Sequence, residues 1–166
     1  MDKVKIGVIA DTHIANKKDN LPKEILDAFK DVDMIIHAGD ITDISLLDKL
    51  KKICKNIKAV YGNMDPLETK KQLSEKKIIK AGNYKIGVAH GCGHPLKLIE
   101  LLTNMFKNDH VDIIIFGHSH SPLNEQRNGI LYFNPGSPFD KIFAPYNSYG
   151  ILEINDKIKA KIVRIQ

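Results

Sequence analysis

Two histidines one residue apart, His118 and His120, stand directly after the apolar run at residues 112–116. In an extended chain, side chains two residues apart point to the same side, so the two imidazoles can approach one centre. Imidazole is a common metal ligand, and two histidines at the end of a buried strand are well placed to bind one metal ion. Taken alone, the pair is equally compatible with a surface loop that happens to contain two histidines.

Four other apolar runs also lead into residue types that bind metals. Carboxylate and amide oxygens mixed with imidazole suit Mn, Fe, Zn, Ni or Co better than Ca or a thiolate-rich zinc site. Seven such ligands are too many for one ion, whereas two ions that share a bridging carboxylate would use them all, and paired metals serve phosphoryl transfer. The candidate metal ligands are Asp11, His13, Asp40, Asn63, His90, His118 and His120.

The elements that must position these residues follow from hydrophobic periodicity. In the first half, strands alternate with amphipathic helices, which predicts a parallel sheet with ligands at the carboxyl ends of its strands. The expected strands are 3–10, 32–38 and 57–61, and the expected helices are 23–29 and 44–53.

The second half of the chain changes character, because strands 77–80 and 84–89 are joined only by a short turn, as in a hairpin. A helix over 96–106 and a strand over 112–116 follow, and then short antiparallel strands at 130–133, 149–154 and 157–163. We therefore predict an α/β fold, a single domain over residues 1–166 with an α/β/β/α sandwich of two mixed sheets flanked by helices.

Composition limits the function classes. The chain has 166 residues, 43% hydrophobic and 27% charged, as in globular domains, and two cysteines that give no disulfide framework. It contains no apolar stretch near the roughly 20 residues that span a bilayer, and the N-terminus does not resemble a signal peptide, so we expect a cytoplasmic protein without membrane contact. The net charge of +5 comes from dispersed lysines and only two arginines, which argues against specific nucleic-acid recognition and favours an anionic substrate.

The order of the motifs resembles that of the calcineurin-like metallophosphoesterase superfamily. Its series Asp-x-His, Gly-Asp, Gly-Asn-x-Asp/Glu, His and Gly-His-x-His matches residues 11–13, 39–40, 62–65, 90 and 117–120. The short length and the Asn-Pro-Gly-Ser sequence at 134–137 are similar to the small YfcE- and MJ0936-type phosphodiesterases. The resemblance covers nearly the whole chain.

The resemblance implies a phosphodiesterase that hydrolyses a small phosphate ester by in-line attack of a hydroxide bridging two divalent ions, of which Mn is the first expectation and Ni, Fe, Co and Zn are alternatives. Asp11, His13, Asp40 and His120 would hold one ion, and Asp40, Asn63, His90 and His118 the other. Asp40, Asn63 and His90 would be catalytic through that hydroxide. Phosphomonoesterase activity and a homo-oligomer are left open.

Several nearby residues are expected to have supporting roles. We expect His37 to be a core or supporting histidine, and His94 either to reach substrate or to begin a helix beside Pro95. Residues 134–137 are expected to form a turn at the rim of the site. Relatives commonly carry an arginine shortly after this turn, where this chain offers only Lys141.

Met64 stands where many relatives have a histidine that protonates the leaving group, which a thioether cannot do. Asp65, which would orient that histidine, is instead predicted to be the N-cap of a helix begun by Pro66. The rival to catalysis is a protein-interaction scaffold, since the retromer subunit Vps29 resembles these enzymes. Retention of all seven ligands favours catalysis.

Overall fold

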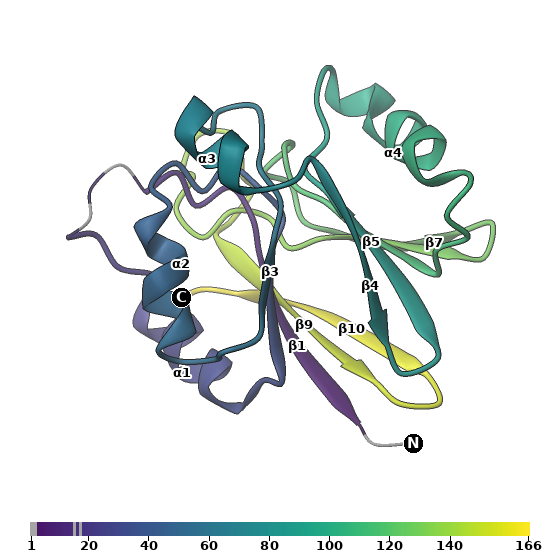
Figure 1. Cartoon of the computed structure of the whole chain (residues 1–166), viewed down its shortest axis with the longest axis horizontal. Helices are drawn as coiled ribbons and strands as arrows, with labels where there is room; N and C mark the ends of the chain where they lie inside the picture. The colour runs from purple at the N-terminus through teal and green to yellow at the C-terminus, as the bar shows by residue number, and fades with distance from the viewer. Residues whose placement is uncertain (1–2, 15, 17) are drawn as a thin grey trace.

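The computed structural model describes residues 3–14, 16 and 18–166. Two five-stranded sheets pack face to face, with α1 and α2 outside the first sheet and α4 outside the second (Figure 1). The elements are β1 (Val4–Ile9), α1 (Lys23–Ala28), η1 (Phe29–Asp31), β2 (Met34–His37), α2 (Ser45–Lys51), β3 (Ile57–Ala59), α3 (Leu67–Gln72), β4 (Lys76–Ala81), β5 (Tyr84–Ala89), η2 (Pro95–Lys97), α4 (Leu98–Phe106), β6 (Ile113–Ile115), β7 (Leu123–Arg127), β8 (Ile130–Asn134), β9 (Ser148–Ile154) and β10 (Ile158–Arg164).

The first sheet has the strand order β10-β9-β1-β2-β3, and β1, β2 and β3 are parallel. Ile9 pairs with His37, and His37 pairs with Ala59. This register sets the carboxyl ends of the three strands level, so that the loops after them begin at one edge of the sheet. The predicted β-α-β-α-β start is confirmed.

The second sheet has the order β4-β5-β6-β8-β7, and β5, β6 and β8 are parallel. The hairpin of β4 and β5 is confirmed. The prediction that the strand at 130–133 would be only antiparallel was wrong, because β8 runs parallel to β6 on one side and antiparallel to β7 on the other. β7 itself was not predicted, since its sequence Leu-Asn-Glu-Gln-Arg is polar and exposed at an edge and lacks apolar alternation.

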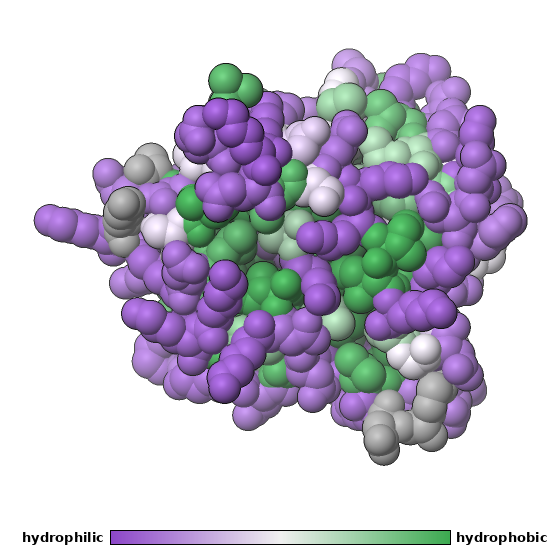
Figure 2. All heavy atoms as spheres, viewed as in Figure 1, coloured by the Kyte–Doolittle hydropathy of each residue, from purple (hydrophilic) through white to green (hydrophobic). Residues whose placement is uncertain are grey.

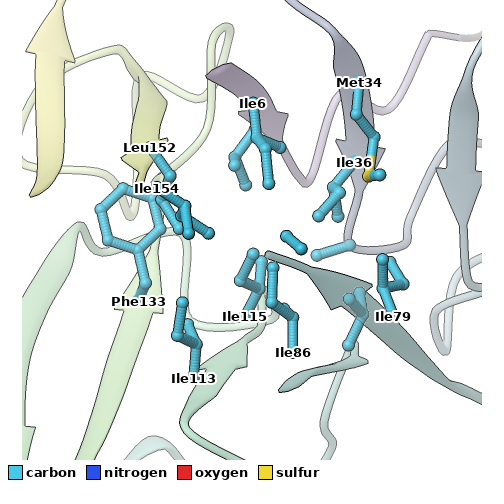
Figure 3. Close-up of a cluster of buried hydrophobic side chains, with 14 of the residues drawn as sticks. Ile6, Met34, Ile36, Ile79, Ile86, Ile113, Ile115, Phe133, Leu152 and Ile154 are labelled. Atoms are coloured by element: carbon cyan, nitrogen blue, oxygen red, sulfur yellow. The ribbon is translucent and has the colours of Figure 1, made fainter. Parts of the chain in front are cut away.

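Apolar side chains from both sheets fill the space between them (Figure 3). Ile6, Ile36 and Leu152 of the first sheet meet Ile86 and Ile115 of the second, and all five are fully buried. Two further apolar layers lie under α1 and α2 and under α4. The predicted fold class, two mixed sheets flanked by helices, is therefore confirmed.

Charged side chains surround these layers. Figure 2 shows hydrophilic side chains over most of the viewed face, with hydrophobic atoms gathered near β3 and β4. Among the described residues, none of the helices has the length and apolarity to cross a bilayer.

Candidate metal centre

All seven candidate ligands lie in the loops that follow β1, β2, β3, β5 and β6. Five of them have positive φ angles, namely Asp11 (52°), His13 (44°), Asp40 (54°), His118 (69°) and His120 (57°). Residues other than glycine rarely adopt this conformation, which costs roughly 1–3 kcal/mol each and persists only where the surrounding structure imposes it. Such concentration of strained residues at one edge marks it as a candidate functional site.

Four of these residues converge on one point. Asp11, His13, Asp40 and His120 each offer one ligand atom, and these atoms all lie within 4.8 Å of one another. The Nε2 atoms of His13 and His120 are 3.2 Å apart, and His120 Nε2 is 3.3 Å from Asp11 Oδ1. Ligand atoms this close together could hold one metal ion.

The Asp11 carboxylate gives the clearest test of whether the residues fit a metal. Both of its oxygens are buried, and neither has a hydrogen-bond partner among the described residues. The backbone around it is fixed, because Asp11 N–H donates to Gly39 O and the Ser137 hydroxyl donates to Asp11 O. The Nε2 atoms of His120, His90 and His13 surround Asp11 Oδ1 at 3.3, 3.6 and 3.8 Å. A buried carboxylate faced by three imidazole nitrogens is a donor set that a cation fits well.

The His90 ring also presents a nitrogen to the carboxylates of Asp11 and Asp40. Its Nδ1 donates to Ala38 O at 2.8 Å, which leaves the buried Nε2 without a hydrogen-bond partner, 3.2 Å from Asp40 Oδ2 and 3.6 Å from Asp11 Oδ1. Burial lowers the pKa of His90, but the two carboxylates outweigh burial and raise it. A lone pair directed at two carboxylates requires a proton or a metal ion between them.

The charge of the cluster also acts on Asp40. Burial by itself raises the pKa of Asp40, but interaction with His90 and the N–H group of Met64 outweighs burial, so the pKa of Asp40 lies below its ordinary value. Asp40 is therefore ionised near neutral pH. Its two oxygens face different partners, since Oδ1 accepts from Met64 N–H and Oδ2 lies 3.5 Å from His13 Nε2.

Asn63 and His118 contact each other beside His90. His118 Nδ1 is 3.2 Å from Asn63 Oδ1, and His118 Nε2 is 2.7 Å from Gly93 O. The His118 and His90 rings are 5.5 Å apart, close to perpendicular. Asn63 is exposed and His118 is half-buried. These two residues are thus beside the cluster, and both ring nitrogens of His118 already have polar neighbours.

Asp140 is a residue that the sequence analysis missed. Its Oδ2 lies 2.5 Å from His120 Nδ1, which directs His120 Nε2 towards Asp11. Asp140 also accepts the N–H groups of Ile142, Phe143 and Ala144. Burial raises the pKa of Asp140, but these N–H groups and His120 outweigh burial and lower it to about 2. The sequence offers no local signal, because Asp140 lies 20 positions after His120.

Asp65 has a different role from the one predicted. It does not cap α3, whose N-cap is Pro66. The buried Asp65 carboxylate instead accepts the N–H groups of Gly62 at 2.7 Å, Asp40 at 3.0 Å and Thr42 at 2.7 Å. The N-cap prediction was wrong because these three backbone donors, from the loops after β2 and β3, take the carboxylate away from the helix. Asp65 therefore supports the backbone of Asp40.

His37 and His94 lie outside the cluster. The buried His37 accepts Gly39 N–H at Nδ1 and contacts the Thr12 hydroxyl at Nε2, and burial lowers its pKa to about 3. The prediction of a supporting core histidine is confirmed. The exposed His94 uses Nδ1 to accept Leu96 N–H at the start of η2, and no described contact joins it to the candidate ligands.

The turn at 134–137 does more than shape the rim. The buried Asn134 side chain donates to Gly117 O at 2.9 Å and to Ser119 Oγ at 3.1 Å, so it holds the loop that carries both histidines. Close packing also explains the glycine at 117, where a Cβ would lie 2.8 Å from Asp11 Oδ2. Gly62 is needed for the same reason, since a Cβ there would overlap the Asp40 carboxylate.

Comparison with known proteins agrees with this geometry. The model of the calcineurin-like phosphoesterase superfamily domain matches residues 4–157. The chain therefore belongs to the calcineurin-like phosphoesterase superfamily, and the resemblance proposed from the motifs is confirmed.

Individual relatives extend this finding. The chain is 42% identical to a probable metallophosphoesterase, MJ0623 of Methanocaldococcus jannaschii, over 97% of this chain and 81% of the relative. It is 30% identical to phosphodiesterase MJ0936 of the same organism, over 80% of this chain and 83% of the relative. It is also similar to a crystal structure of Vps29 from Entamoeba histolytica in complex with zinc, with a TM-score of 0.74, 25% identity and coverage of 97% of this chain and 99% of the other.

Proposed function

We propose that this protein is a phosphodiesterase that depends on two divalent metal ions. The observation that carries the proposal is the Asp11 carboxylate, buried with both oxygens unpartnered and facing the Nε2 atoms of His90 and His120. The family and the phosphodiesterase among the relatives support the same activity.

In this proposal Asp11, His13, Asp40 and His120 hold one ion, and Asp40, Asn63, His90 and His118 hold the other. When bound, two divalent ions would neutralise the phosphoryl oxygens and lower the pKa of a water molecule near phosphorus.

Hydrogen bonds within the protein would orient the metal-binding histidines. The hydrogen bonds from His90 Nδ1 to Ala38 O and from His120 Nδ1 to Asp140 leave Nε2 of each ring free as a ligand. Asp40 is the residue we propose as the bridge, because a carboxylate offers two anionic oxygens.

Hydrolysis of bis(p-nitrophenyl) phosphate, with calorimetric titration of each metal, tests this function. We expect activity with at least one of Mn, Ni, Co, Fe and Zn, and uptake of two ions per chain. Absence of hydrolysis with all five metals, together with uptake of fewer than two ions, would contradict it.

A scaffold role is the second candidate, because a zinc complex of Vps29 shares the fold. Metal binding alone therefore does not separate the two functions. Hydrolysis that disappears on chelation and returns with the metal would favour the enzyme, whereas two bound ions without hydrolysis of any phosphate ester would favour the scaffold.

A further inference from the structure

A pocket of about 520 Å³ opens beside the candidate metal centre and shares three of its residues, Asp11, His13 and His120. Its outer wall includes two aromatic side chains, Phe139 and Phe143, which the proposed chemistry does not use. A phosphate group at the metal centre would therefore have a defined space next to it for one of its substituents.

The aromatic wall is held in place by the same residues that support the ligands. Ser137 Oγ accepts the N–H groups of Phe139 at 3.3 Å and Asp140 at 3.1 Å, while donating to Asp11 O. Phe143 N–H donates to the Asp140 carboxylate at 3.2 Å. Asn147 Nδ2 ties the loop from the other side by donating to Asp140 O at 2.7 Å.

Phe143 is directed at the metal centre although most of its surface is open. Its ring centroid lies 6.2 Å from that of His120, with the planes at 78°, while 74% of the residue remains exposed. An exposed phenylalanine at the rim of a pocket is unfavourable in water, and such surfaces often mark ligand-binding grooves. Most of a rigid aromatic ring is thereby open to contact with a ligand.

The charge of the pocket argues against a second phosphate. None of its described lining residues is lysine or arginine. Lys18 and Lys141 are each adjacent in sequence to a lining residue, but neither lines the pocket. Asp19 and Asp140 add carboxylates beyond the candidate ligands, so the described lining suits a neutral ring better than a second phosphate.

We propose that this pocket binds an uncharged aromatic substituent of the phosphate ester, stacked on Phe143. The proposal rests on the proposed function, because the metal centre must hold the phosphoryl group. The expected substrates are aryl or nucleoside-like esters, in which a planar group adjoins the phosphate.

Calorimetric binding of two phosphonates to the Mn-loaded protein tests the pocket without turnover. Phenylphosphonate and methylphosphonate present the same headgroup and differ only in the substituent. We expect phenylphosphonate to bind about tenfold more tightly, as stacking on one aromatic ring provides. In Phe143→Ala, phenylphosphonate should bind less than about threefold more tightly than methylphosphonate. The affinity for methylphosphonate should equal that of the wild type.

Ile142→Ala is the matched control, since Ile142 is 83% exposed in the same loop but does not line the pocket. It should keep the wild-type ratio, and Phe143→Trp should keep or increase it. Equal binding of the two phosphonates to the wild type, or an unchanged ratio in Phe143→Ala, would contradict the proposed aromatic-binding role of the pocket. Neither result would contradict the proposed phosphodiesterase function. If neither phosphonate binds the metal-loaded protein, the proposed function itself fails, and the pocket proposal falls with it.

Discussion

Asp11, His13 and His120 form a cluster with Asp40, called the buried cluster because the Asp11 carboxylate at its centre is buried, although both histidines are half-buried. Asn63 is exposed, and it hydrogen-bonds to His118, which is half-buried too. The Asp11 oxygens have no hydrogen-bond partner among the described residues, and neither has the Nε2 atom of His90, which we assign to the second proposed ion. His118 must give up its Asn63 and Gly93 contacts before that ring can bind a metal. In the proposed two-ion site, the residues around Asp11 are therefore better prepared to bind a metal than Asn63 and His118.

Preorganisation of this kind has a thermodynamic consequence. A cation at the buried cluster removes an existing electrostatic penalty, while a cation at the second position must first break hydrogen bonds. We therefore expect two ions to bind in separate steps, with the affinity of the buried cluster at least tenfold higher.

Asp40→Asn should have the largest effect, because Asp40 is the one residue that we assign to both proposed ions. Loss of its charge should remove high-affinity metal uptake and lower kcat/KM for bis(p-nitrophenyl) phosphate by a thousandfold or more, as expected when a charged ligand common to both ions is removed. Metal content by mass spectrometry and steady-state kinetics would measure this.

His37→Asn is the comparison variant, since His37 is buried nearby but holds Thr12 and the Gly39 backbone instead of facing the cluster. This variant should have a lower melting temperature than the wild type but nearly the same metal content per folded chain. Equal losses of activity in the two variants, at equal folded fraction by circular dichroism, would show that Asp40 has no special position.

Single-histidine variants should separate the two halves. His120→Ala should abolish the tighter calorimetric step, because His120 belongs to the buried cluster. His118→Ala should remove only the weaker step and leave the first within about threefold. Loss of both steps in both variants would mean that the two positions are filled cooperatively and that the asymmetry is unimportant.

Asp140→Asn should weaken the tighter step by 10- to 100-fold, the usual cost of losing a carboxylate that orients a metal-binding histidine. The amide can still accept N–H groups from the loop but no longer provides a negative charge for His120 Nδ1–H. Asp27→Asn, an exposed carboxylate on α1, provides the control and should leave both steps unchanged. Unchanged metal affinity in Asp140→Asn would limit its role to the loop at 140–144.

The same contrast explains what could be predicted from sequence. The ligands at the strand ends could be predicted from the sequence because each buried parallel strand is followed within a few residues by a metal-binding residue type, as Asp40 follows Ala38. Asp140 and Asp65 act across long separations, through backbone N–H groups whose positions depend on the packed loops. β7 was missed because an exposed edge strand needs no apolar alternation. Phe139 and Phe143 carry no motif at all.

Met64→His should have the smallest effect. Met64 is 63% exposed, and its N–H donates to Asp40 Oδ1 at 2.8 Å, so a histidine there would lie near the leaving group in the proposed reaction. A well-placed general acid contributes roughly a hundredfold to ten-thousandfold. In this chain, however, Asp65 is already occupied by three backbone N–H groups and is not free to orient the new imidazole.

We therefore expect wild-type rates to fall steeply as the leaving-group pKa rises across a series of aryl diesters, with alkyl esters cleaved weakly. Met64→His should raise kcat/KM for the poorest leaving groups by less than tenfold and flatten the slope only slightly. Met64→Gln, which has no titratable proton, should leave the slope unchanged. A wild-type enzyme that cleaves aryl and alkyl diesters at similar chemical rates would contradict the expectation, because another proton donor would then already act beside Asp40.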